Sequence, residues 1–207
     1  GKKSKSAAVI NENEEAAKAL VKGPMKDSIK FANVQGTVKY IADTDKSILN
    51  WKSGLHTGYV KFHAGVLYAQ DNQVIAGEFY MDMDSIVDTD IDYLLMKETL
   101  ENVLRSSDWF FSNKFPLSVF KIKSTVYSDT DSVQIFGSLN LLDISQDITF
   151  KASIDFLNDS IIAFSECFLI DRTHWNILTM SDEHVKDDNS FIVPDKIEIR
   201  VEVIAKH

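Results

Sequence analysis

The 207-residue chain has a single cysteine, only eight glycines and three prolines, and no long hydrophobic run. One cysteine excludes an intramolecular disulfide and any zinc site built from several thiolates. Cys167 lies between apolar residues of a predicted strand, which indicates a buried small side chain rather than a catalytic thiol. No stretch approaches the roughly 18 apolar residues of a membrane-spanning helix. The first residues also lack the apolar core of a signal peptide.

Positive charge is also scarce, with 22 Lys+Arg against 31 Asp+Glu and a formal net charge of −9. This balance argues against a nucleic-acid partner, because such proteins bind phosphates mainly through lysine and arginine. The hydrophobic content of 44% is too high for a disordered chain. The length predicts one globular domain with or without a tail.

Motifs of enzymes and metal proteins are missing as well. The chain has no glycine-rich phosphate loop, no G-x-S-x-G turn and no H-E-x-x-H run. His56 and His63 are seven residues apart, which is not the spacing of two metal ligands on one strand. The sequence therefore predicts no catalytic residue, no metal site and no cofactor.

The acidic run D-T-D-I-D at 88–92 is weakly similar to a calcium-binding loop. It has Tyr93 where such a loop needs glycine, and Thr99 where it needs glutamate. Asp88, Asp90 and Asp92 are better interpreted as carboxylates at the start of a helix, where they interact favourably with the helix dipole.

Residues 1–33 differ from the rest in composition. They have mixed charge, many small residues and a Gly-Pro pair, and the first 24 contain no aromatic residue. We interpret them as a tether, with a short helix as an alternative for part of it, and predict a barrel domain over residues 34–207.

From there on, apolar and polar residues alternate with a period of two, which is typical of half-buried strands. Turn-forming clusters such as 43–47, 70–72, 128–132 and 157–160 separate the segments, so neighbouring strands should be antiparallel. The alternating positions are Leu49 and Trp51; Val60 and Phe62; Phe79, Met81 and Met83; Phe120 and Ile122; Ile135, Gly137, Leu139 and Leu141; Ile148, Phe150, Ala152, Ile154 and Phe156; Phe164, Phe168 and Ile170; and Ile197, Ile199, Val201 and Val203.

One segment changes to helical spacing and predicts a helix over about 90–106. The apolar residues that recur at this spacing are Tyr93, Met96, Leu100, Val103 and Leu104. An aromatic run follows at 109–115. Long alternating strands with a single inserted helix predict a mainly β fold. The expected form is an antiparallel up-and-down barrel of about eight strands, which closes its own sheet edges.

The inward faces of these strands are almost entirely apolar. They predict either a channel for an apolar ligand or a packed core, and the pattern alone leaves both open. Arg172 ends one strand and has two interpretations: a structural ion pair with Asp82 or Asp171, or a contact to a ligand headgroup at the barrel mouth. The predicted ligand-binding residues are Leu49, Trp51, Val60, Phe62, Phe79, Met81, Trp109, Phe110, Phe120, Ile122, Leu139, Leu141, Phe150, Ala152, Phe164, Phe168, Ile170 and Arg172.

The order of several short motifs resembles the YceI-like family of polyisoprenoid-binding proteins. Each motif is weak alone, but six occur in the family's order across residues 36–204. They are SILNW (47–51), HTGYVKFHAGVLY (56–68), GEFYMDMDSI (77–86), LENVLRSSDWFFSNKFPLSVF (100–120), VQIFGSLNLLDISQDITF (133–150) and FLIDRTHWNI (168–177). The chain departs from the family at Val103, Trp109 and Asn176, which stand in place of His, Phe and Gly, and lacks a hairpin glycine near Ile144–Ser145.

The resemblance implies a lipocalin-like barrel that binds, without catalysis, a long-chain amphiphile such as a polyisoprenoid or an isoprenoid quinone. It also implies export to the bacterial periplasm or cell envelope. The start GKKSKS resembles the linker of a lipoprotein, so a lipid anchor tethering the protein to a membrane is one interpretation, and a homodimer is another. Two alternatives stay open: an envelope interaction module with a packed barrel, and a hydrolase that uses His56 or His174.

Overall fold

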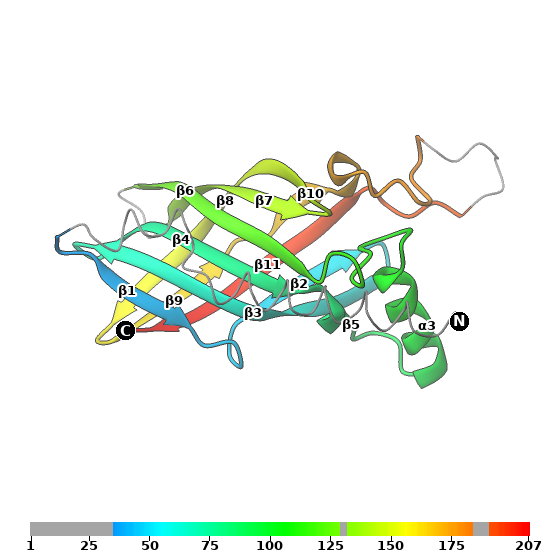
Figure 1. The fold of residues 1–207 in the computed structure, drawn as a ribbon, viewed down its shortest axis with the longest axis horizontal. Helices are drawn as coiled ribbons and strands as arrows, with labels where there is room; N and C mark the ends of the chain where they lie inside the picture. The colour runs from blue at the N-terminus through cyan, green and yellow to red at the C-terminus, as the bar shows by residue number, and fades with distance from the viewer. Residues whose placement is uncertain (1–34, 129–131, 184–190) are drawn as a thin grey trace, which may run out of the picture.

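The computed structural model describes residues 35–128, 132–183 and 191–207 (Figure 1). The predicted tether at 1–33 lies outside the described residues. Within them, no helix is both long and apolar enough to cross a membrane. The strands are β1 Val38–Ala42, β2 Ile48–Ser53, β3 His56–Gln70, β4 Gln73–Asp82, β5 Val87–Asp88, β6 Leu117–Tyr127, β7 Val133–Leu141, β8 Ile144–Leu157, β9 Ser160–Ser165, β10 Phe168–Asp171 and β11 Lys196–Lys206; the helices are η1 Met83–Ser85, α3 Leu94–Arg105 and η2 Arg172–Trp175.

Eight strands form a closed antiparallel ring in the order β2, β3, β4, β6, β7, β8, β9 and β11. The ring closes because β11 pairs with β9 on one side and with β2 on the other. This confirms the predicted up-and-down barrel, whose closure removes the exposed edges of an open sheet.

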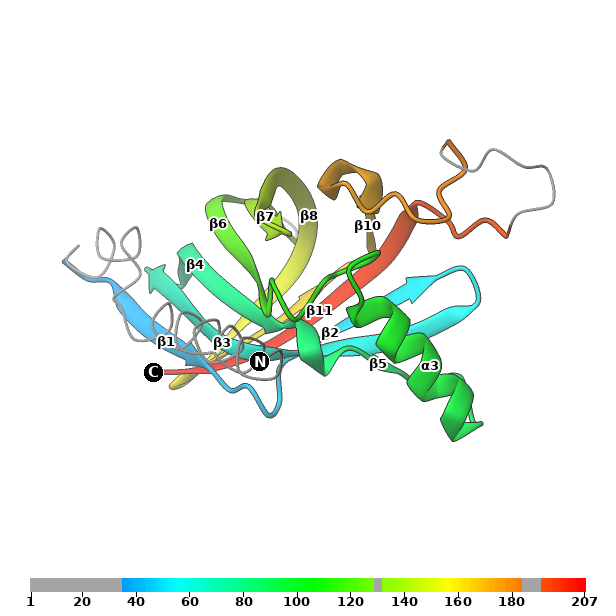
Figure 2. The same ribbon diagram turned by 45° about the vertical axis from the view of Figure 1, so that its right-hand side comes forward.

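Two positions in the ring are each shared by two short strands. β1 and β2 both lie between β3 and β11, with β2 pairing at His56–Lys61 of β3 and β1 farther along the same strand. β9 and β10 share the other side of β11 in the same way. Figures 1 and 2 show β1 and the C-terminus at one end of the barrel and α3 at the opposite end.

Tight hairpins connect the long strands. Asp71 and Asn72 join β3 to β4, and Leu142 and Asp143 join β7 to β8; all four have positive φ angles between 51° and 61°. Such two-residue turns suit the right-handed twist of the strands, and Asn and Asp tolerate this conformation well. Leu142, however, occupies a left-handed position that a branched side chain rarely adopts.

Helix α3 begins four residues later than predicted, at Leu94, and its first turn has no acidic residue. Asp88 instead ends β5, and Asp90 lies in the connection that leads to the helix. The interpretation of this acidic run as carboxylates at the helix start is therefore wrong.

The predicted strand through Phe164 and Ile170 is broken into β9 and β10, with Glu166 and Cys167 between them. The break shifts the alternation by one residue, because the inward positions of β9 are odd-numbered and those of β10 are even-numbered. Phe164 therefore points outward and is 45% exposed. Cys167 is exposed rather than buried for the same reason, since it lies in the break.

Candidate binding cavity

The barrel encloses an apolar cavity of about 670 Å³ to which all eight ring strands contribute side chains. This volume falls within the roughly 300–1,000 Å³ typical of small-molecule sites. The interior is thus not filled by the protein's own side chains. Sixteen of the predicted ligand-binding residues line it: Leu49, Trp51, Val60, Phe62, Phe79, Met81, Trp109, Phe110, Phe120, Ile122, Leu139, Leu141, Phe150, Ala152, Phe168 and Ile170.

Two of the predicted residues do not reach the cavity. Phe164 lies on the outer face of β9, and its neighbours Ala163 and Ser165 line the wall in its place. Arg172 is completely buried but is not part of the cavity wall.

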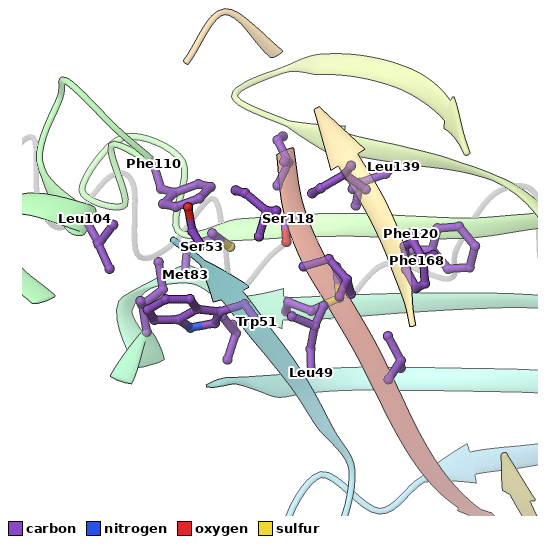
Figure 3. Close-up of a pocket in the computed structure, with 18 of the residues that line it drawn as sticks. Leu49, Trp51, Ser53, Met83, Leu104, Phe110, Ser118, Phe120, Leu139 and Phe168 are labelled. Carbon is purple, nitrogen blue, oxygen red and sulfur yellow. The ribbon is translucent and has the colours of Figure 1, made fainter. Parts of the chain in front are cut away.

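The aromatic part of the wall is a stack of rings from three strands. The rings of Phe150 and Phe168 are nearly parallel with centroids 4.4 Å apart, and Phe120 lies 5.6 Å from Phe150. Gly137 makes room for this arrangement, because a Cβ atom there would lie 2.3 Å from the Phe120 ring. Figure 3 shows Phe120 and Phe168 together at one side of the close-up.

The mouth of the cavity lies between α3 and the segment that begins at residue 191. Leu95, Met96 and Phe191 line the cavity although their side chains are 62%, 61% and 76% exposed. Large apolar side chains exposed together are unusual on a soluble surface and often mark a binding site. Sequence reasoning found the helical spacing of α3 but did not assign the helix to the cavity.

Polar atoms in the wall are few and concentrate toward α3. Trp51 and Ser53 of β2 lie in the part of the cavity near Leu104 and Phe110 (Figure 3). The Trp51 Nε1 and Ser53 Oγ atoms are buried and have no hydrogen-bond partner among the described residues. A buried polar atom without a partner is costly, so these two atoms favour a ligand with a polar group at this point.

The side chain of Arg172 is fixed by contacts to other residues of the protein. All of its guanidinium nitrogens donate to protein oxygens, and the guanidinium carbon lies 4.9 Å from the centre of the Trp109 ring. Burial lowers the pKa of Arg172, and the carboxylates of Asp195 and Asp171 oppose this effect. The hydrogen-bond acceptors are the carbonyls of Ile177 (2.7 Å), Thr179 (2.9 Å), Val193 (3.0 Å) and Pro194 (3.2 Å). The Asp195 carboxylate forms an ion pair with the guanidinium at 3.0 Å.

These contacts favour the structural interpretation of Arg172. The expected ion-pair partners, Asp82 and Asp171, are not the ones observed; the partner is Asp195, which follows the segment around residues 184–190 and precedes β11. Asp171 instead accepts hydrogen bonds from Thr173.

Residues 21–205 match the model of the YceI-like domain. The chain belongs to the YceI-like family. No curated protein matched it in a sequence comparison.

Solved structures share the fold of this YceI-like chain at low sequence identity. BcnA of Burkholderia cenocepacia is 16% identical with a TM-score of 0.65, covering 80% of this chain and 99% of its own. A polyisoprenoid binding domain from Saccharophagus degradans is 12% identical with a TM-score of 0.57, covering 81% and 97%. The Campylobacter jejuni YCEI protein is 18% identical with a TM-score of 0.52, covering 76% and 84%.

Proposed function

We propose that this YceI-like protein is a non-enzymatic carrier or storage protein for a long-chain apolar amphiphile, such as a polyisoprenoid or an isoprenoid quinone. The observation that carries the proposal is the cavity of about 670 Å³, whose wall is almost wholly apolar. Family membership supports a lipid-binding role, and one structural neighbour is itself a polyisoprenoid binding domain. The open cavity argues against the alternative of a packed interaction module.

The wall also suggests how such a ligand would be oriented. The hydrocarbon chain would lie against the Phe120, Phe150 and Phe168 rings, and the polar end would lie near Trp51 and Ser53. Burying about 400 Å² of hydrocarbon would contribute roughly 10 kcal/mol before the costs of association. The exposed apolar side chains at the mouth provide a route for the chain to enter. Export to the periplasm or cell envelope, the lipid anchor and the homodimer stay predictions.

A matched pair of variants tests the proposal. Ala152 is buried and faces the cavity, whereas the adjacent Lys151 is exposed on the outer face of β8. Ala152→Trp should fill part of the channel and weaken the binding of a fluorescent prenyl-chain probe at least tenfold. Lys151→Trp adds the same ring outside and should leave the affinity unchanged.

Binding is measured by probe fluorescence and, for co-purified lipid, by native mass spectrometry. Circular dichroism verifies that both variants are folded. A wild-type protein that binds no prenyl-chain probe and carries no lipid would contradict the proposal, as would equal affinities of the two tryptophan variants.

A further inference from the structure

A second cluster of polar side chains lies beside the cavity mouth. His56 is the first residue of β3, and Asp88 ends β5, which pairs with β3 through Gly58. Asp90 follows two residues later. The His56 Nδ1 atom lies 3.1 Å from Asp90 Oδ2 and 3.7 Å from Asp88 Oδ2, and the three groups have one ligand atom each within 4.8 Å of the others.

Backbone hydrogen bonds orient both carboxylates toward the histidine. Asp88 Oδ1 accepts from the N–H groups of Asp90 (3.2 Å) and Ile91 (2.9 Å). Asp90 Oδ1 accepts from the N–H of Thr57 at 2.6 Å. In each carboxylate, Oδ1 is thereby fixed to the main chain and Oδ2 faces His56. Metal sites use this kind of supporting hydrogen bond to hold their ligands.

One oxygen of the buried Asp88 carboxylate lacks a hydrogen-bond partner. Its side chain is 0% exposed, yet its Oδ2 has no hydrogen bond among the described residues. Glu101, whose carboxylate accepts the N–H of Asp88 at 3.0 Å, adds a further negative charge nearby and is paired with Arg105 at 3.5 Å. A buried carboxylate oxygen without a partner is costly, so the cluster is suited to a bound cation.

We propose that His56, Asp88 and Asp90 bind a divalent transition-metal ion of the zinc type at the rim of the cavity. Zinc binds imidazole nitrogen at about 2.0–2.1 Å and carboxylate oxygen at about 2.0–2.2 Å, which places tetrahedral ligand atoms about 3.3 Å apart. The observed separations of 3.1 and 3.7 Å lie on either side of this value. The imidazole ligand favours zinc-type ions over Ca²⁺ and Mg²⁺, which prefer oxygen ligands alone.

The cluster is accessible through His56. The side chain of His56 is 43% exposed and also lines the cavity. An ion held there would therefore have a coordination position open to solvent or to a ligand.

The test uses the full chain, without a polyhistidine tag, and Zn²⁺ as the probe. Isothermal titration calorimetry at about pH 7.5 should show one Zn²⁺ bound per chain. His56→Ala and Asp88→Asn should each weaken binding at least tenfold. His63→Ala is the matched control, because His63 is an exposed residue of the same strand, and it should leave the affinity unchanged.

Cobalt substitution provides a second readout, because Co²⁺ at a site of nitrogen and oxygen ligands absorbs visible light without the charge-transfer band of a thiolate. Asp90→Asn serves as a further variant, since Asp90 is more exposed than Asp88. Absence of Zn²⁺ binding would overturn the proposal. Equal binding of Ca²⁺, or an affinity that is lost in His63→Ala but retained in His56→Ala, would also overturn it. Lipid binding is not needed for any of these outcomes.

Discussion

Two buried charges of this protein differ in how completely the fold surrounds them with partners. The guanidinium of Arg172 donates to four backbone carbonyls and forms an ion pair with Asp195, so each of its nitrogens has an acceptor. The carboxylate of Asp88 is equally buried, but one of its oxygens has no hydrogen bond among the described residues. The fold thus supplies the partners of Arg172, whereas one oxygen of Asp88 is left without a hydrogen bond, at the position where we propose a cation.

The partners of Arg172 show what it stabilises. They come from residues 177–179 and 193–195, two segments of irregular backbone within the β10–β11 connection. Irregular backbone has carbonyl groups without partners of its own, and a planar guanidinium with five donors can serve several of them at once. Arg172 also packs on Trp109, which lines the cavity, so it fixes part of the barrel end.

Removing the Arg172 charge should have the largest effect. Arg172→Met keeps much of the apolar stem but leaves four carbonyls without their donor and Asp195 without its ion-pair partner. We expect a loss of about 3–5 kcal/mol in the free energy of unfolding, as for other buried pairs that lose one partner. Urea denaturation followed by tryptophan fluorescence measures this loss.

Arg172→Lys separates the effect of the charge from the effect of the hydrogen bonds, because an ammonium keeps the charge but has only three donors. It should lose less stability than Arg172→Met and more than a surface variant. A cost below about 1 kcal/mol for Arg172→Met would show that the hydrogen bonds around Arg172 contribute little.

Gly58→Ala should disrupt the cluster of His56, Asp88 and Asp90 by displacing the backbone of β5. A Cβ at Gly58 would lie 1.9 Å from the Val87 carbonyl oxygen and 2.5 Å from the Trp51 ring, so β5 would have to move away from β3. We expect a loss of about 1–3 kcal/mol in stability, typical of overpacking, together with a loss of Zn²⁺ binding. Chemical denaturation and calorimetry measure the two effects.

The control for Gly58→Ala is Lys61→Ala, an exposed change on the same strand. It should alter stability by no more than about 0.5 kcal/mol. If Gly58→Ala retained both full stability and full Zn²⁺ affinity, the β3–β5 pairing would not be what positions Asp88.

Features that depend on local sequence could be predicted. Alternation with a period of two places successive side chains on opposite faces, so residues such as Phe120 and Phe150 were correctly assigned to the barrel interior. The helix around Leu100 was found from its spacing in the same way. The prediction for Phe164 was wrong because two residues without strand pairing, 166 and 167, shift the alternation and no sequence pattern marks them.

Features that depend on distant segments could not be predicted. The acceptors of Arg172 are backbone carbonyls, which carry no sequence signal, and its ionic partner Asp195 is 23 residues away along the chain. His56 and Asp88 meet only because β5 pairs with the start of β3. The spacing within the acidic run 88–92 carries no information about His56, which lies more than 30 residues earlier in the chain, so the sequence did not predict that they meet.

Asp88→Asn should have the smallest effect on stability and so gives the sharpest contrast with Arg172. Asparagine keeps the Oδ1 acceptor for the N–H groups of Asp90 and Ile91, and it replaces the buried charged oxygen that has no partner by a neutral amide group. In the presence of a chelator, the free energy of unfolding should stay within about 1 kcal/mol of wild type or rise slightly.

Saturating Zn²⁺ should raise the free energy of unfolding of wild type more than that of Asp88→Asn. A ligand at 100 times its dissociation constant stabilises the folded state by about 2.7 kcal/mol, so wild type should gain this amount and Asp88→Asn should gain little. Asp88→Ala, which also removes Oδ1, should lose about 1–3 kcal/mol even without metal, because two partly buried N–H groups then lack an acceptor. If Asp88→Asn were as destabilising as Arg172→Met with chelator present, the Asp88 charge would be part of the fold's own stability, and the difference between the two sites would disappear.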